Sequence, residues 1–203
     1  MSEATLSTLL EKILHKSVRL DRTDKLWSVQ GSQKDVYFRV TDKRSFGFCL
    51  DENNRIKSRD TSDGKQVDLS GSPLSFFADS PPSDIAKMCD GILAFTYRGQ
   101  DYVFCIELKG NCTESYRKQM NNAILFCDWL IALLKQYGYY EKRPCFVGIL
   151  VKHRPGNVDK NVKDQNYIIG DKNKNDKFDQ LLIVENSEEI FCFDICKAIQ
   201  PAV

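Results

Sequence analysis

The sequence has few histidines and no long apolar run. Only two histidines, His15 and His153, occur in 203 residues, which excludes a histidine cluster or a His-x-x-x-His zinc helix as the source of any chemistry. The best apolar run is interrupted by Asp128 and falls short of the roughly 18 residues of a membrane-spanning helix. The first residues also lack a basic start and a small-residue cleavage site. We therefore expect neither a membrane-spanning helix nor a secretory signal peptide.

Several phosphate, cofactor and nucleophile motifs are also missing. The sequence has no Gly-rich phosphate loop, no GxGxxG and no GxSxG, which argues against a P-loop NTPase, a dinucleotide enzyme and an α/β-hydrolase. Asp171, Asn173 and Asn175 begin like a calcium loop, but Asp176 replaces the glycine and Leu182 replaces the bidentate glutamate. We interpret this stretch as a solvated turn.

The eight cysteines do not form a recognisable framework. None pairs as CxxC, and several lie inside apolar runs such as 103–106 and 190–196. This pattern predicts reduced thiols that behave as small hydrophobic residues in a cytoplasmic protein. The alternative is a structural zinc site assembled from distant cysteines in an interaction protein, which metal analysis would reveal.

The formal net charge of +1 hides a segmental pattern. Residues 16–59 and 135–177 carry an excess of basic side chains, whereas residues 61–111 carry an excess of acidic ones. Carboxylates bind divalent cations, and Lys and Arg bind phosphates. The pattern therefore predicts a cation site between two walls that contact a polyanion; the alternative is a set of solvated lysine-rich loops.

Hydrophobic periodicity predicts one α/β domain over residues 1–203, with a mixed central sheet flanked by helices. Residues 90–97 and 102–108 are rich in β-formers and predict an antiparallel hairpin around Arg98 and Gly99. A long apolar stripe follows, with Asn111 and Glu114 as a capping box and Gly138 as the stop. The fully apolar run 145–151 then predicts a strand parallel to its neighbour.

The remaining segments give weaker signals. Residues 5–17 have apolar residues at helical spacing, which predicts an amphipathic helix. Residues 34–41 and 45–50 alternate in the manner of short half-buried strands. Two apolar runs near the end, QLLIV and IFCFDIC, together with NYIIG before them, predict further strands or a short helix.

Three charged residues flank the predicted hairpin. If Arg98 and Gly99 form the turn, Asp90 lies opposite Glu107; a turn shifted by one residue places Asp90 opposite Lys109. Since Glu107 and Lys109 are two residues apart, they share one face of the strand, and either register brings the three side chains together.

This arrangement suits metal-assisted chemistry. Two carboxylates on adjacent strands can share a hard divalent cation such as Mg²⁺ or Mn²⁺. A lysine on the same face can orient a metal-bound water and balance charge that develops on phosphorus. The alternative is that Glu107 and Lys109 form an ordinary exposed pair at a strand edge.

The segment CDGILAFTY…YVFCIELKG, within residues 85–151, resembles the signature of the PD-(D/E)XK nucleases, which share the restriction-endonuclease-like fold. The resemblance implies Asp90 and Glu107 as metal ligands, with the backbone carbonyl of Leu108, and Lys109 as the catalytic lysine. It also implies a further metal-ligating glutamate on the first helix and a supporting glutamine on the helix after the signature. These two residues would be Glu11 and Gln119. The sequence departs from the family pattern in having Cys89 where proline often precedes the first acid.

The predicted function is hydrolysis of phosphodiester bonds by an Mg²⁺- or Mn²⁺-dependent endonuclease or exonuclease, acting in restriction, defence or repair. DNA is favoured over RNA as the partner, and homo-oligomerisation or a protein partner stays open. Candidate phosphate contacts are Lys152, Arg154, Lys160 and Lys163. The alternative is a catalytically silent protein of the same fold that binds nucleic acid or serves as an assembly subunit.

Overall fold

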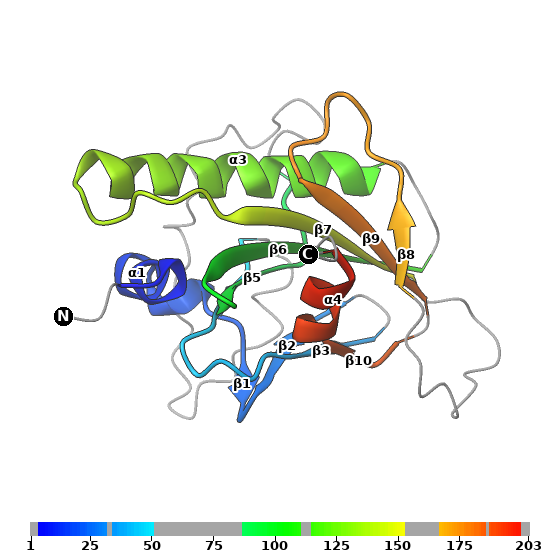
Figure 1. The fold of residues 1–203 in the computed structure, drawn as a ribbon. Coiled ribbons are helices and arrows are strands. Elements are labelled where there is room, and N and C mark those ends of the chain that lie inside the picture. Colours follow the sequence, from blue (N-terminus) through cyan, green and yellow to red (C-terminus); the bar gives the residue numbers. More distant parts are fainter. Residues whose placement is uncertain are drawn as a thin grey trace, which may run out of the picture.

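The computed structural model describes residues 4–31, 34–50, 87–110, 115–152, 167–185 and 187–199, which form an α/β fold with two mixed sheets (Figure 1). The helices are α1 (Leu6–Ile13), a 3-10 turn (Lys16–Val18), α3 (Ser115–Gln136) and α4 (Cys192–Ile199). The strands are β1 (Arg22–Thr23), β2 (Leu26–Val29), β3 (Val36–Arg39), β4 (Phe46–Phe48), β5 (Gly91–Tyr97), β6 (Gln100–Lys109), β7 (Cys145–Lys152), β8 (Tyr167–Gly170), β9 (Gln180–Glu185) and β10 (Glu189–Phe191).

The larger sheet contains the predicted hairpin. Its strand order is β4-β5-β6-β7-β9-β8. Strands β6, β7 and β9 are parallel to one another, whereas β5 runs antiparallel to both β4 and β6, and β8 runs antiparallel to β9. Helix α3 connects β6 to its parallel neighbour β7. The predicted mixed sheet, long helix and parallel strand are thus confirmed.

The turn of the hairpin explains its register. Arg98 and Gly99 both have positive φ, 49° and 79°, as a two-residue type I′ turn requires. The ladder pairs Tyr97 with Gln100 and continues to Gly91 opposite Ile106. The first of the two predicted registers is therefore the one that forms, and it places Asp90 opposite Glu107.

A second sheet was not predicted. It has the order β1-β2-β3-β10, and β10 pairs in parallel with β3, from the other end of the chain. The apolar segment 190–196 divides at Cys192: a short strand comes first, and helix α4 follows. Strands this short carry little periodic signal, and the pairing depends on contact between remote segments.

The two faces of the larger sheet are covered differently. One face packs against α1 and α3, and the opposite face packs against the smaller sheet and α4 (Figure 1). Strand β4 is consequently buried on both faces rather than half-buried as predicted. Gly47 shows how close the layers are, because a Cβ there would lie 2.7 Å from the Trp27 ring.

The first helix is shorter than predicted. It ends at Ile13, and Leu14 is already extended. The Nδ1 atom of His15 accepts a hydrogen bond from the Ser17 backbone N–H at 3.2 Å. This local bond competes with helix continuation, and the chain enters a 3-10 turn. Helix α3 instead ends where predicted, with Gly138 at φ 69° and the Tyr139 N–H bonded to the Leu134 carbonyl.

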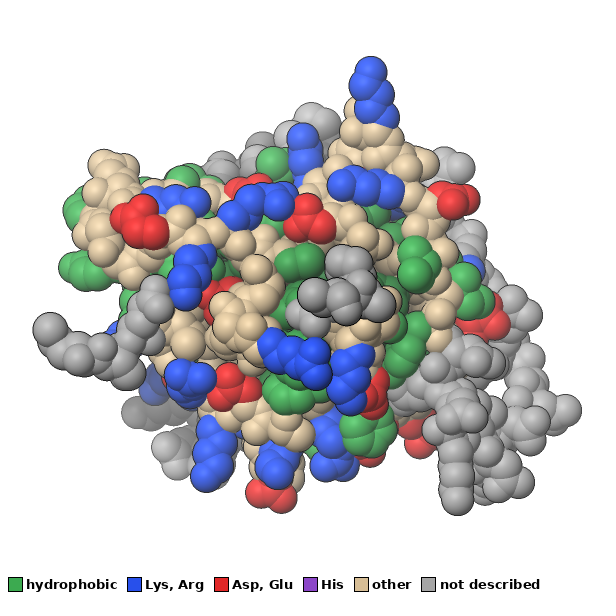
Figure 2. Space-filling model, in the orientation of Figure 1, with side chains coloured by type: hydrophobic (Ala, Val, Ile, Leu, Met, Phe, Trp, Pro, Cys, Tyr) green, Lys and Arg blue, Asp and Glu red, His purple; other side chains and the backbone are tan. Residues whose placement is uncertain are grey.

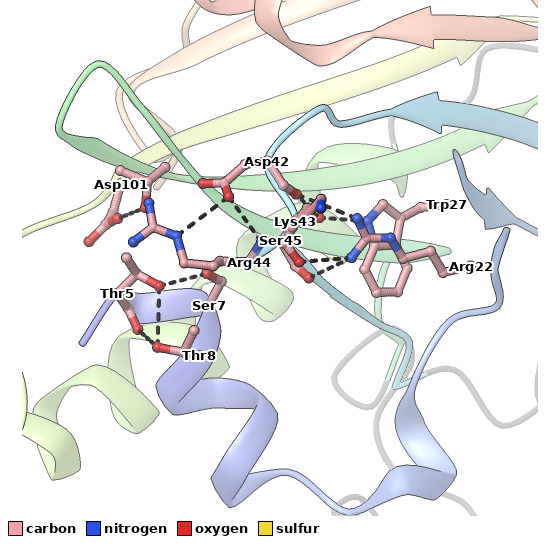
Figure 3. Close-up of polar contacts among 11 residues, drawn as sticks. Thr5, Ser7, Thr8, Arg22, Trp27, Asp42, Lys43, Arg44, Ser45 and Asp101 are labelled. Atoms are coloured by element: carbon pink, nitrogen blue, oxygen red, sulfur yellow. Dashed lines mark hydrogen bonds and ion pairs between the residues drawn. The ribbon is translucent and has the colours of Figure 1, made fainter. Parts of the chain in front are cut away.

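Arg22 holds the loop before β4 (Figure 3). Its guanidinium lies over the Trp27 ring at 5.1 Å and donates to the Lys43 carbonyl at 3.2 Å. The Trp27 indole N–H donates to the Ser45 hydroxyl at 3.0 Å. These contacts connect the two sheets beside β4, which borders β5.

The described cysteines are free thiols, and six of the seven are buried, which confirms their interpretation as core residues. Burial raises the pKa of the Cys127 thiol and keeps it protonated. None of the helices in the described ranges combines the length and apolar character that crossing a bilayer requires.

Candidate active site

The three charged residues lie together at the open end of the hairpin, away from its turn and below α3. Asp90 immediately precedes β5, and Glu107 and Lys109 lie near the end of β6. Glu107 shares its strand face with Val103 and Cys105, which belong to the core that α1 and α3 cover. The predicted neighbourhood of Asp90, Glu107 and Lys109 is therefore present in the structure.

Glu107 is a fully buried carboxyl group. Its side chain is 0% exposed, and both carboxyl oxygens lack a hydrogen-bond partner among the described residues. Burial, followed by the charge of Asp90, raises its pKa from 4.5 to about 8, against the lowering effect of Lys109. The Lys109 ammonium forms an ion pair with Oε1.

Asp90 is held in place by the strand it faces. Its Oδ2 accepts a hydrogen bond from the Leu108 backbone N–H at 2.7 Å. The N–H and C=O of one strand residue point to the same side, so the Leu108 carbonyl also faces the Asp90 side of β6. This direction agrees with the predicted use of that carbonyl as a neutral oxygen ligand, which stays a prediction.

Helix α3 contributes Gln119. The Nε2 of Gln119 lies 3.5 Å from the Met88 carbonyl, two residues before Asp90. Its Oε1 is buried and has no partner among the described residues. The next turn adds Asn122, whose Nδ2 donates to the Lys87 carbonyl at 2.9 Å. The helix thus anchors the segment that presents Asp90.

Two positioning contacts were missed by the sequence analysis. One is that of Asn122, whose only signal is a polar residue beside the apolar stripe of the helix. The other is Cys89, whose Sγ donates to the Gly91 carbonyl at 3.3 Å and so bridges the residues on either side of Asp90. Both contacts depend on the path of the chain before β5.

Glu11 is not brought to this site. Its side chain is 46% exposed and forms an ion pair with Arg19. Nowhere in the described ranges do three or more His, Cys, Asp or Glu side chains form a group that could hold a metal. Glu11 therefore does not join Asp90 and Glu107 as a third acidic ligand, because the helix that carries it directs it toward Arg19.

Of the predicted phosphate contacts, only Lys152 can be placed. It ends β7 directly beside Lys109 in the parallel ladder, and Glu185 of β9 is its neighbour on the other side. Lys152 thus extends the row of charged residues across the ends of these neighbouring strands. Arg154, Lys160 and Lys163, like the predicted capping box of Asn111 and Glu114, lie outside the described residues.

The donor set fits a hard divalent cation. Three buried oxygens without a described partner, two on Glu107 and one on Gln119, lie beneath the same helix as Asp90. A buried polar atom without a partner costs about 1–3 kcal/mol, and an ion with oxygen ligands would satisfy several such atoms at once. Only two of the donors are acidic, so the neutral oxygens of Leu108 and Gln119 and water would complete the coordination.

Comparison of the chain with models of known families, with curated proteins and with solved structures gives no match.

Proposed function

We propose that the chain is a metal-dependent nuclease that hydrolyses phosphodiester bonds, with DNA favoured over RNA. The observation that carries the proposal is the buried Glu107 carboxyl, which lies directly opposite Asp90, is ion-paired with Lys109 and accepts no well-formed hydrogen bond from the described residues. A structural carboxyl at 0% exposure would be expected to have hydrogen-bond donors. A carboxyl that binds a cation has a physical reason to lack them.

The order of the elements supports a restriction-endonuclease-like core. Helix α1, the antiparallel strands β4, β5 and β6, helix α3 and strand β7 follow the family order of helix, three-stranded meander, helix and strand. The acidic residues and the lysine of the signature also lie at one end of that meander. The smaller sheet would then be an addition to this core.

Each side chain would have a separate role in hydrolysis. Asp90 and Glu107 would hold Mg²⁺ or Mn²⁺, with the Leu108 carbonyl and the Gln119 Oε1 as neutral donors. The bound ion would act as a Lewis acid and lower the pKa of a coordinated water. The Lys109 side chain is 25% exposed, so its ammonium can reach a substrate phosphate, orient the attacking water and stabilise negative charge as it develops on phosphorus.

Lys109→Ala separates turnover from binding. An interaction made mainly in the transition state lowers kcat and leaves ground-state affinity in place. We expect cleavage of plasmid, linear and single-stranded DNA to fall by roughly 10²–10⁴-fold, while calorimetry finds Mn²⁺ affinity changed little. Asp90→Asn and Glu107→Gln should lose metal affinity and cleavage together.

Lys135→Ala is the matched control, because Lys135 is an exposed lysine in the last turn of α3. Cleavage by Lys109→Ala at the rate of this control would refute the assigned mechanism. If wild type binds DNA but cleaves neither DNA nor RNA with Mg²⁺ or Mn²⁺, the nuclease proposal is wrong, and the catalytically silent binding or assembly subunit replaces it.

A further inference from the structure

A groove with a volume of about 440 Å³ lies where α1 ends and the 3-10 turn begins. Its charged lining is mostly basic, and its aromatic wall is a phenylalanine of β4. The residues that matter here are Lys12, His15, Lys16, Arg19, Glu11 and Phe46. We call this hollow the α1 groove. Among the described residues that line it, three permanently cationic side chains outnumber one carboxylate, which makes the groove suited to anions.

Arg19 is oriented within the α1 groove. Its guanidinium lies 5.4 Å from the centre of the Phe46 ring and forms an ion pair with Glu11. A guanidinium stacked on a ring keeps its plane and its donors in a defined direction. Because the Arg19 side chain is still 45% exposed, part of its donor edge is accessible to a ligand.

The α1 groove lies on the same side of the larger sheet as the candidate active site. Phe46 and Phe48 share their core with α1, α3 and the face of Glu107. Arg19 bridges to Phe48, and Phe48 pairs with Ile92, two residues after Asp90. Strand spacings of about 4.8 Å and rises of about 3.3 Å per residue put the Arg19 backbone about 12 Å from that of Asp90.

This separation corresponds to a few nucleotides, because one strand of a duplex advances about 3.4 Å per nucleotide. Figure 2 shows Lys and Arg side chains also gathered below α3 over the region of β1, β2 and β3, whose sheet covers the other face of the larger sheet. Lys152 lies on the opposite side of the active site, beside Lys109. The acidic pair is thus bordered by basic side chains on two sides.

We propose that the α1 groove binds backbone phosphates of the nucleic acid, a few nucleotides from the phosphate that is cleaved. This inference rests on the proposed nuclease function. Lys12 and Lys16 neutralise the phosphates as point charges, and Arg19 donates to a phosphate oxygen from its position over Phe46. The contacts are to the backbone, so they position the strand without reading its sequence.

The inference gives Glu11 a role opposite to that of a metal ligand. A ligand that is neutralised weakens metal binding and activity. In the α1 groove, Glu11 instead opposes the approach of phosphate, so Glu11→Gln should bind DNA more tightly and leave Mn²⁺ affinity unchanged. The two roles predict effects of opposite sign for the same substitution.

The test measures binding of a fluorescein-labelled 20-base-pair DNA by anisotropy, in chelator and over a series of salt concentrations. Lys12→Ala combined with Lys16→Ala should weaken binding roughly tenfold at low salt and make the slope of log Kd against log salt shallower by about two. The control is Arg98→Ala combined with Lys197→Ala. It removes the same charge from exposed positions outside both basic segments, at the turn of the hairpin and on α4, and should retain the wild-type slope.

Wild-type hydrolysis of the p-nitrophenyl ester of thymidine 5′-phosphate is measured in parallel. This ester has one phosphate and cannot span the distance to the α1 groove, so its turnover tests the proposed function alone. If the groove double variant binds DNA like its control, or if Glu11→Gln weakens Mn²⁺ binding, the inference about the groove is wrong even though the ester is hydrolysed. If the groove double variant binds DNA more weakly as expected but wild type cleaves neither the ester nor DNA, the α1 groove binds nucleic acid and the proposed nuclease function is wrong.

Discussion

Glu107→Gln should change how the stability of the protein depends on pH. The Glu107 carboxyl is 0% exposed, and burial, together with Asp90, raises its pKa from 4.5 to about 8. Between these two values the folded protein holds a proton that the unfolded chain releases. Because stability falls with pH wherever the native state binds more protons, the free energy of unfolding should decrease from pH 4.5 to pH 8.

The magnitude follows from the same two values. The difference between 4.5 and about 8, at about 1.4 kcal/mol per pH unit, gives a loss of at most about 5 kcal/mol. A glutamine at position 107 cannot ionise and has nearly the same shape. It should match wild type near pH 5, where the glutamate is protonated, and should exceed it by several kcal/mol at pH 8.5.

The assay is urea unfolding in chelator at half-unit steps from pH 5 to pH 8.5, with Glu141→Gln as the control at an exposed position. Fluorescence of the buried Trp27 reports the transition. Subtracting the Glu107→Gln profile from that of wild type removes the contribution of every other titrating group. A flat difference across this range would refute the argument that burial forces Glu107 to keep its proton.

Divalent cations should offset the loss of wild-type stability at high pH, because a bound ion replaces the proton on Glu107. At pH 8, millimolar Mg²⁺ or Mn²⁺ should raise the stability of wild type by mass action and leave Glu107→Gln almost unchanged. At pH 5 the same cations should have little effect on either protein. Equal stabilisation of both proteins at pH 8 would show that the ion binds elsewhere.

Three further substitutions test the site and the far end of the hairpin that carries it. Gln119→Leu should raise the free energy of unfolding by about 1 kcal/mol, because it removes the buried Oε1 that has no described partner. The same substitution should lower Mn²⁺ affinity in calorimetry. A decrease in both stability and Mn²⁺ affinity would contradict the view that this Oε1 is costly in the metal-free protein. Gly99→Ala should cost about 1 kcal/mol in urea unfolding, because φ is 79° at this position. Tyr140→Phe should cost about 1–3 kcal/mol by the same measurement, because it removes the hydroxyl that donates to the buried Asp101 carboxylate at 2.8 Å.

Local patterns in the sequence determined the elements that position the site. The alternation on either side of Arg98 and Gly99 predicts the hairpin, and the turn that these residues form decides the register that places Asp90 opposite Glu107. Side chains alternate along a strand, so Lys109 must share the face of Glu107. The stripe before Gly138 likewise predicts α3. These features depend on backbone dihedrals and on neighbours within a few residues, which a sequence displays directly.

The tertiary structure alone decided how these residues are surrounded. The burial of Glu107 and its raised pKa arise because α3 covers this face of the hairpin, and Asn122 and Cys89 act on the Asp90 segment only through the folded path of the chain. The pairing of β3 with β10 joins segments from opposite ends of the chain.

Glu11 is a residue that the sequence predicts for the site and that the fold places elsewhere. Its spacing beside an apolar stripe suits a metal ligand as well as a surface residue, and the fold directs it to Arg19 over Phe46. Desolvation and ion pairing depend on which distant groups come within a few ångströms of each other, and helical spacing carries no information about that. The sequence therefore predicts which residues share the strand end, and the packing decides which of them bear unsatisfied oxygens.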